Sequence, residues 1–139
     1  RNCGSCWAFA STTNIEYLMQ IKNYTIVNLS EQELVDCSKQ NNGCDGGLMH
    51  LAFDYIIKKK GLISASNYPY KAQNLDCKLK KTPRVKGSDI NDYEFTVPRS
   101  ISDMMKSLEN GPISIAIDAN TFMFRFYKSG IINIPRNGY

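Results

Sequence analysis

The sequence contains one histidine and one tryptophan in 139 residues, and it has no long hydrophobic run. A membrane-spanning helix needs about 20 consecutive apolar residues, so we expect no membrane span. The chain begins with Arg1 rather than Met and shows no signal peptide. We therefore expect a partial sequence, with any targeting signal removed together with the missing start.

The charge of the chain is modest and shows no nucleic-acid pattern. The formal net charge of +4 arises from 17 Lys and Arg against 13 Asp and Glu, and many of the basic residues lie in 58–60 and 78–86. Aromatic residues do not alternate with these basic residues, and no nucleic-acid motif is present. We interpret them as a solvated basic surface and expect no nucleic-acid partner. A hydrophobic content of 42% suffices for one ordinary core.

Five cysteines are many for a cytosolic chain of this length and ordinary for a secreted one. The odd number favours two disulfides and one free thiol, which the sequence alone permits in about 15 arrangements. Two Asn-x-Ser/Thr sequons, at Asn23 and Asn28, are candidate glycosylation sites and fit a secretory route. We therefore expect a protein of the secretory pathway, lysosomal or extracellular.

The segment Cys3-Gly4-Ser5-Cys6-Trp7 specifies the chemistry of this chain. Cys6 opens a predicted helix over 6–21, where unpaired N–H groups and the helix dipole favour the nucleophilic thiolate. Cys3 and Cys6 could form a redox pair, although no strand precedes them as thioredoxin-type motifs require. Alternatively, Cys6 is a protease nucleophile and Cys3 part of a disulfide.

Two further interpretations of the same cysteines remain. In the first, Cys3 and Cys6 are half of a zinc site, although the spacing of the other candidate cysteines is wide for a zinc knuckle. The other half would come from Cys37, Cys44, His50 or Cys77. In the second, the cysteines form a disulfide scaffold without any chemistry.

Periodicity predicts a helical first part and a β-rich second part. Helices are expected over 6–21, from Ser30 towards Val35, over 48–59 and over 101–108. Ser30 to Glu33 has the S-x-x-E form of a capping box. A strand is expected over 113–117 and further strands within 122–134, and 86–88 reads as a connector. This division suggests two lobes.

Five collinear blocks resemble the papain family of cysteine proteases (peptidase family C1), in particular its cathepsin L type. They are CGSCWA from Cys3, LSEQELVDC from Leu29, GCDGGLM from Gly43, Tyr68-Pro69-Tyr70 and GPISIAIDA from Gly111. The longer string GCDGGLMHLAF resembles the cathepsins of insect baculoviruses, which would place the protein in a virus-infected host cell. The resemblance covers nearly the whole chain.

The resemblance implies an α+β fold of two lobes. Residues 1–88 would form the helical left lobe that carries the nucleophile. Residues 89–139 would begin the β-rich right lobe as an incomplete β-barrel, truncated before the catalytic histidine. Cys6 would be the nucleophile, and its backbone N–H would contribute to the oxyanion hole. Cys3 would pair with Cys44 and Cys37 with Cys77, which leaves Cys6 free.

The resemblance also implies a substrate cleft. Gly46 and Gly47 would line its non-primed side, where the lack of a Cβ lets a substrate strand approach the backbone. Leu48, Met49 and Ala116 would line an apolar S2 pocket, so we expect a preference for Leu, Phe or Val at P2.

His50 is the only histidine, yet we do not expect it to be the general base, because the family has no catalytic group at this position. The family's histidine and asparagine lie about 130–150 residues after the nucleophile, and its oxyanion-hole glutamine lies just before Arg1. We therefore expect His50 at the margin of the cleft, and no peptide hydrolysis by these 139 residues alone.

The activity implied for the whole protein is that of a cysteine endopeptidase, working through a thioester without metal or cofactor. Its partners would be protein and peptide substrates, an inhibitory propeptide and cystatin-like inhibitors, and it would be a monomer. An inactive, truncated homologue that only binds peptides is the main alternative.

Overall fold

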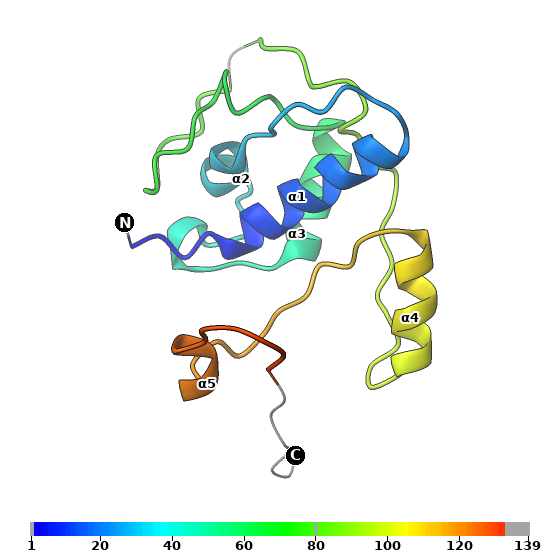
Figure 1. The fold of residues 1–139 in the computed structure, drawn as a ribbon. Helices are drawn as coiled ribbons and strands as arrows, with labels where there is room; N and C mark the ends of the chain where they lie inside the picture. The colour runs from blue at the N-terminus through cyan, green and yellow to red at the C-terminus, as the bar shows by residue number, and fades with distance from the viewer. Residues whose placement is uncertain (1, 80, 133–139) are drawn as a thin grey trace.

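The structure, a computed structural model, describes residues 2–79 and 81–132. Its helices are α1 (Cys6–Ile21), α2 (Glu31–Cys37), the short 3-10 helix η1 (Gly43–Asp45), α3 (Met49–Lys59), α4 (Ile101–Asn110) and α5 (Phe122–Arg125). Helices α1, α2 and α3 form one cluster, whereas α4 and α5 lie apart from it (Figure 1). No helix in the described part is long and apolar enough to cross a membrane.

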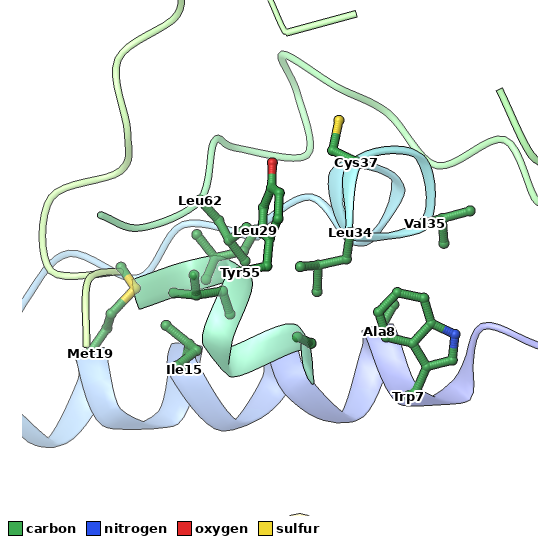
Figure 2. Close-up of a cluster of buried hydrophobic side chains, with 12 residues drawn as sticks. Trp7, Ala8, Ile15, Met19, Leu29, Leu34, Val35, Cys37, Tyr55 and Leu62 are labelled. Atoms are coloured by element: carbon green, nitrogen blue, oxygen red, sulfur yellow. The ribbon is translucent and has the colours of Figure 1, made fainter. Parts of the chain in front are cut away.

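One hydrophobic core lies between α1, α2 and α3 (Figure 2). Helix α1 contributes side chains at helical spacing that are at most 1% exposed, among them Trp7, Ile15 and Met19. Full burial of such a side chain stabilises the fold by about 1.5–3 kcal/mol. The predicted helix over 6–21 is therefore confirmed, and its apolar stripe is what packs it against α2 and α3.

At the start of α2, only one of the two hydrogen bonds of the predicted capping box is formed. Ser30 Oγ accepts a hydrogen bond from the Glu33 N–H at 2.9 Å, as an N-cap serine should. The Glu33 side chain does not return to the Ser30 backbone, as the full motif requires. It is fully buried and accepts hydrogen bonds from Tyr55 and the Ile63 N–H instead. The expectation of a reciprocal capping box was wrong because the core uses this carboxylate.

Helix α3 runs from Met49 to Lys59, one residue shorter at its start than predicted. It ends where Lys60 adopts the left-handed conformation (φ 57°), and Gly61 follows at φ 106°. A left-handed residue is a common helix terminator. The chain then pairs with the segment before α2 through an antiparallel bridge between Leu29 and Ser64. Leu29 and Leu62 from these two segments are fully buried in the core.

The second half of the described chain packs less tightly. Helix α4 has no buried residue, and no described residue beyond Ser88 is buried. The predicted strand over 113–117 is wrong, because these residues form neither strand nor helix. A strand needs a neighbouring strand to accept and donate its backbone hydrogen bonds, and among the described residues no such neighbour lies beside it.

The expected strands within 122–134 are also wrong for the described residues 122–132, and positions 133–134 lie outside the described part. Phe122–Arg125 is the short helix α5, whose start is capped by Thr121 Oγ1 accepting from the Phe124 N–H at 3.3 Å. The local cap outweighs the β propensity of the aromatic residues here.

Candidate active site

Cys6 is the first residue of α1, and it is the one free cysteine in the part of the chain that the structure describes. Its side chain is exposed. The preceding residue, Ser5, is buried, and its hydroxyl forms a hydrogen bond of 2.6 Å with the hydroxyl of Tyr70. The ring of Tyr70 in turn packs edge-on against Phe9 with centroids 5.0 Å apart. These contacts fix the chain on both sides of the exposed thiol.

A disulfide between Cys3 and Cys44 ties the segment before Cys6 to the turn of η1. The Gly4 N–H donates to the Cys44 carbonyl at 2.7 Å beside this bond. A Cβ at position 4 would lie only 2.8 Å from the same carbonyl oxygen, so the close approach requires glycine. The turn is thereby held next to the start of the helix that carries Cys6.

Trp7 anchors the same turn from the core. Its indole Nε1–H donates to the Gly43 carbonyl at 3.0 Å, and the indole is 1% exposed. At Gly47 an added Cβ would lie 2.7 Å from the indole ring, closer than real Cβ contacts. Gly47 is therefore needed for packing, whereas Gly46 has a left-handed φ of 110° and an added Cβ there would meet no atom within 4 Å.

Two asparagines that no sequence motif marks hold the backbone of this turn. The Asn41 side-chain carbonyl accepts from the Leu48 N–H at 2.8 Å, and that of Asn74 accepts from the Cys44 N–H at 2.7 Å. In a loop without regular structure these N–H groups have no backbone acceptor, and the asparagine side-chain carbonyls accept their hydrogen bonds instead. The only sequence signal was the density of Asn and Gly around Cys44, which indicates a turn but not these pairings.

A cavity of about 360 Å³ lies next to this turn, between α1, α3 and the segments 90–96 and 107–114. Leu48 and Met49 line it together with His50 and Phe53. Leu48 is 51% exposed at the mouth of the cavity. Ala116, the third residue expected in an S2 pocket, is exposed and does not line this cavity. The structure thus brings two of the three S2 candidates together.

The segment that leads to Ala116 is nevertheless attached to α1. The Asn14 side-chain amide donates to the Pro112 carbonyl and to Ser114 Oγ, both at 3.1 Å. Ser114 Oγ donates to the Ala10 carbonyl at 3.4 Å. These bonds attach residues 112–114 to the helix that begins with Cys6.

His50 lies at the cavity and not at the thiol. Its ring packs against Phe95 with centroids 5.4 Å apart, and its side chain is half-buried. Within the described ranges no hydrogen bond joins His50 to Cys6. In the same ranges no three His, Cys, Asp or Glu side chains gather as a metal site.

A charged network centred on the buried Glu33 joins the elements of the core. Arg84 forms an ion pair with Glu33, whose side chain is fully buried while that of Arg84 is 24% exposed. Tyr55 donates to the same carboxylate at 2.9 Å. Burial raises the pKa of the Tyr55 hydroxyl far above its usual value, and the Glu33 charge raises it further. The network clamps α2, α3 and the segment around Ile63 together.

The second disulfide joins Cys37 at the end of α2 to Cys77. With all four of these cysteines in disulfides, none of them is available as a zinc thiolate, and Cys3 is not paired with Cys6. A zinc site would therefore lack its cysteine ligands. A redox pair would require Cys3 to be free to bond with Cys6, and here it is bonded to Cys44. What remains is one exposed thiol at a helix start, next to a disulfide-tied glycine turn whose following residues, Leu48 and Met49, line a cavity.

Comparison with known proteins identifies the class to which this site belongs. A family model described as papain family cysteine protease matches residues 1–138. The chain belongs to this family.

Particular relatives agree with this result. The chain is 47% identical over 131 residues to vignain of Phaseolus vulgaris, covering 93% of this chain and 36% of that protein. It is 42% identical over 130 residues to the senescence-specific cysteine protease SAG12 of Arabidopsis thaliana, covering 94% and 37%. The chain thus spans about a third of the length of the curated relatives it matches.

Solved structures show the same fold. The Carica candamarcensis cysteine protease CMS1MS2, in complex with E-64, superposes with a TM-score of 0.87 at 29% identity, covering 96% of this chain and 62% of that one. The bromelain protease of Ananas comosus, in complex with the E64 inhibitor, superposes with a TM-score of 0.86 at 42% identity, covering 96% and 60%. The expected papain-like fold is confirmed, and the regular elements of the described part are helices, apart from the Leu29–Ser64 bridge.

Proposed function

We propose that the whole protein that carries this chain is a cysteine endopeptidase with Cys6 as its nucleophile. The observation that carries the proposal is the exposed free thiol of Cys6 at the start of a 16-residue helix, beside a turn held by the Cys3–Cys44 disulfide. Unpaired N–H groups at a helix start favour negative charge. Membership of the papain family supports the same role for this thiol.

In the proposed mechanism the Cys6 thiolate attacks the carbonyl carbon of the substrate peptide. The backbone N–H of Cys6, with a glutamine from the preceding part of the whole protein, stabilises the oxyanion that forms. A histidine imidazolium from the following part protonates the leaving amine, and a thioester to Cys6 remains. Water then attacks the thioester, releases the acid product and restores the thiol.

We assign residues 1–88 to the lobe with the nucleophile and residues 89–139 to the start of the second lobe. The change in packing after Ser88 supports this boundary, since no described residue beyond it is buried. The hydrogen bonds of Asn14 to Pro112 and Ser114 then join the two lobes. The substrate would lie across this junction, along Gly46 and Gly47.

The apolar side chains of the cavity lining support a preference for Leu, Phe or Val at P2, although Asp92 and Glu94 line the same cavity. Leu48 and Met49 line it, and the flexible thioether of Met49 can adapt to side chains of different shape. Ala116 completes the proposed S2 pocket if the segment after Ser114 turns towards the cavity when the whole protein is present. The small Ala116 side chain leaves room for a large P2 residue.

The proposed partners are peptide and protein substrates, an inhibitory propeptide and cystatin-like inhibitors, and the protein acts as a monomer. E-64 in the two solved structures supports an inhibitor-binding cleft in the family. We place the protein in the secretory pathway, in line with its two disulfides. A relative named KDEL-tailed cysteine endopeptidase CEP2, 42% identical over 130 residues, supports this route. A baculoviral source stays a prediction of the sequence.

The test compares the hydrolysis of peptides with Leu and with Arg at P2 by the whole protein and by its Cys6→Ala variant. We expect a higher kcat/KM for the Leu peptide and no turnover by the variant. Equal rates for the two peptides would overturn the P2 preference, and turnover by the variant would overturn the role of Cys6. Binding of the peptides without turnover would favour the peptide-binding alternative.

A further inference from the structure

The two glycosylation sequons lie only five residues apart, yet they differ in how far their residues are buried in the folded chain. Both begin in the loop between α1 and α2, and the side chains of Asn23 and Asn28 are both exposed. Exposure of the asparagine therefore does not distinguish the two sites. The difference lies in the burial and hydrogen bonding of the hydroxyl residue of each sequon.

The sequon at Asn28 is built into the folded core. Its middle residue, Leu29, and its acceptor-side serine, Ser30, are both fully buried. The Ser30 hydroxyl donates to the Tyr68 carbonyl at 2.7 Å and caps α2 by accepting from the Glu33 N–H. The backbone on either side is also paired, since the Leu29 N–H donates to Glu16 at 2.7 Å and the Ala65 N–H donates to the Asn28 carbonyl at 2.8 Å.

The sequon at Asn23 stays on the outside. Asn23 has a left-handed φ of 57° just after the end of α1, and Thr25 is exposed. The Thr25 hydroxyl makes no hydrogen bond within the described residues. The backbone of this sequon is tied to the end of α1, since the Asn23 N–H donates to the Gln20 carbonyl at 3.0 Å and the Tyr24 N–H donates to the Met19 carbonyl at 2.9 Å. The Tyr24 ring packs on Gly87, where an added Cβ would lie 2.5 Å from the ring.

We propose that Asn23 is the glycosylated residue of this chain and that folding keeps Asn28 unmodified. An oligosaccharyltransferase must bind the asparagine and the hydroxyl of the sequon together, and only the first sequon presents both after folding. The co-reactant is a lipid-linked oligosaccharide diphosphate. Asn23 Nδ2 forms a bond to C1 of the first sugar, the C1–O bond to phosphate breaks, and the lipid diphosphate leaves. A carboxylate of the transferase takes the proton that Nδ2 loses.

The position of this glycan leaves the candidate active site open. Cys6 and Asn23 lie at opposite ends of α1, and 16 helical residues at about 1.5 Å each separate them by roughly 25 Å. A glycan at Asn23 would therefore cover the far end of α1 and the surface around Gly87, and peptide access to Cys6 would be unchanged.

The experiment is cell-free translation of the whole protein, behind a cleavable signal peptide, with microsomes under oxidising conditions, followed by endoglycosidase digestion and mass mapping of the two sequons. At these two sequons we expect one glycan on the wild type and on Asn28→Gln, and none on Asn23→Gln or Thr25→Ala. With dithiothreitol, which prevents both disulfides and hence folding, we expect a second glycan that Asn28→Gln removes. A glycan on oxidised Asn23→Gln, no glycan on the wild type, or no second glycan with dithiothreitol would overturn the proposal.

Discussion

The indole ring of Trp7 lies directly against the backbone of Gly47, so that no side chain fits between them. The same indole donates a hydrogen bond to the Gly43 carbonyl at 3.0 Å. The turn that carries the expected cleft glycines is therefore positioned by a core residue one place after Cys6. The proposed nucleophile and the proposed wall of the cleft are therefore both held in place by Trp7 and its neighbours in α1.

Replacement of Gly47 by Ala tests this support. The added methyl group would overlap the indole and force the turn away from α1, which should lower the free energy of unfolding by about 1–3 kcal/mol. Urea unfolding followed by the fluorescence of the single tryptophan measures the change. Leu48→Ala, at the neighbouring and half-exposed position, is the control and should change the stability by less. An unchanged stability of Gly47→Ala would contradict the packing argument.

The ion pair of Glu33 and Arg84 predicts an asymmetry between two substitutions. Arg84→Met leaves a fully buried carboxylate without its cation, which should lower the free energy of unfolding by about 3 kcal/mol or more. Glu33→Gln should be less damaging, because Arg84 is 24% exposed and can turn its guanidinium towards water. Chemical denaturation of both single variants and the double variant measures the coupling. The opposite order of the two single variants would contradict the burial of Glu33.

Glu31 predicts a dependence of stability on pH. Burial raises the pKa of the Glu31 carboxyl above its usual value of 4.5, and the nearby Glu16 carboxylate raises it further. The folded chain therefore holds this proton to higher pH than the unfolded chain, so the free energy of unfolding falls as pH rises from the unfolded to the folded pKa. The lost stability is not regained above that window.

Glu31→Gln should remove this part of the pH dependence. Its stability, measured by urea unfolding between about pH 4 and pH 7, should fall less with rising pH than that of the wild type. Glu109→Gln, at an exposed position of α4, removes the same charge and should keep the wild-type slope. A steeper fall for Glu31→Gln would show that the sign is wrong.

Removal of either disulfide should destabilise the chain by a similar amount but affect the thiol differently. The two bridges span 41 and 40 residues, and loop-closure entropy gives each an upper contribution of about 4 kcal/mol. Only the Cys3–Cys44 bridge holds the turn beside Cys6. The double variant Cys3→Ser/Cys44→Ser should therefore also slow labelling of Cys6 by a peptidyl epoxide, whereas Cys37→Ser/Cys77→Ser should not. Equal rates of Cys6 labelling in the two double variants would contradict the claim that only the Cys3–Cys44 bridge positions the turn beside Cys6.

The sequence predicted those parts of the structure that local patterns determine. The helices over 6–21 and 48–59 carry apolar stripes at helical spacing, and Ser30 is an N-cap, so each element was found within about a residue or two. The CGSCW motif predicted that Cys6 begins a helix and led to its proposal as the nucleophile. The isoleucines of 113–117 alternate as in a strand, yet a strand depends on a partner elsewhere in the chain, and no local pattern reveals whether one is present.

The sequence also could not predict contacts between residues that are far apart in the chain and close together in the fold. Nothing in the order of residues shows that Gly47 lies against Trp7, or that Asn74 accepts from the Cys44 N–H thirty positions away. Glu33 illustrates the same limit. Its position three residues after Ser30 predicted that its side chain would cap the start of α2. Only the tertiary structure shows that the carboxylate binds Tyr55 and Arg84 instead.

The most direct test of the proposed role of Cys6 is mass-spectrometric mapping after reaction of the non-reduced chain with a peptidyl epoxide that carries Leu at P2. We predict one adduct, on Cys6, formed faster than with the Arg analogue, and absent from Cys6→Ser. The same digest should show Cys3 linked to Cys44 and Cys37 linked to Cys77. A disulfide between Cys3 and Cys6, or an adduct on another cysteine, would contradict the assignment of Cys6 as the nucleophile.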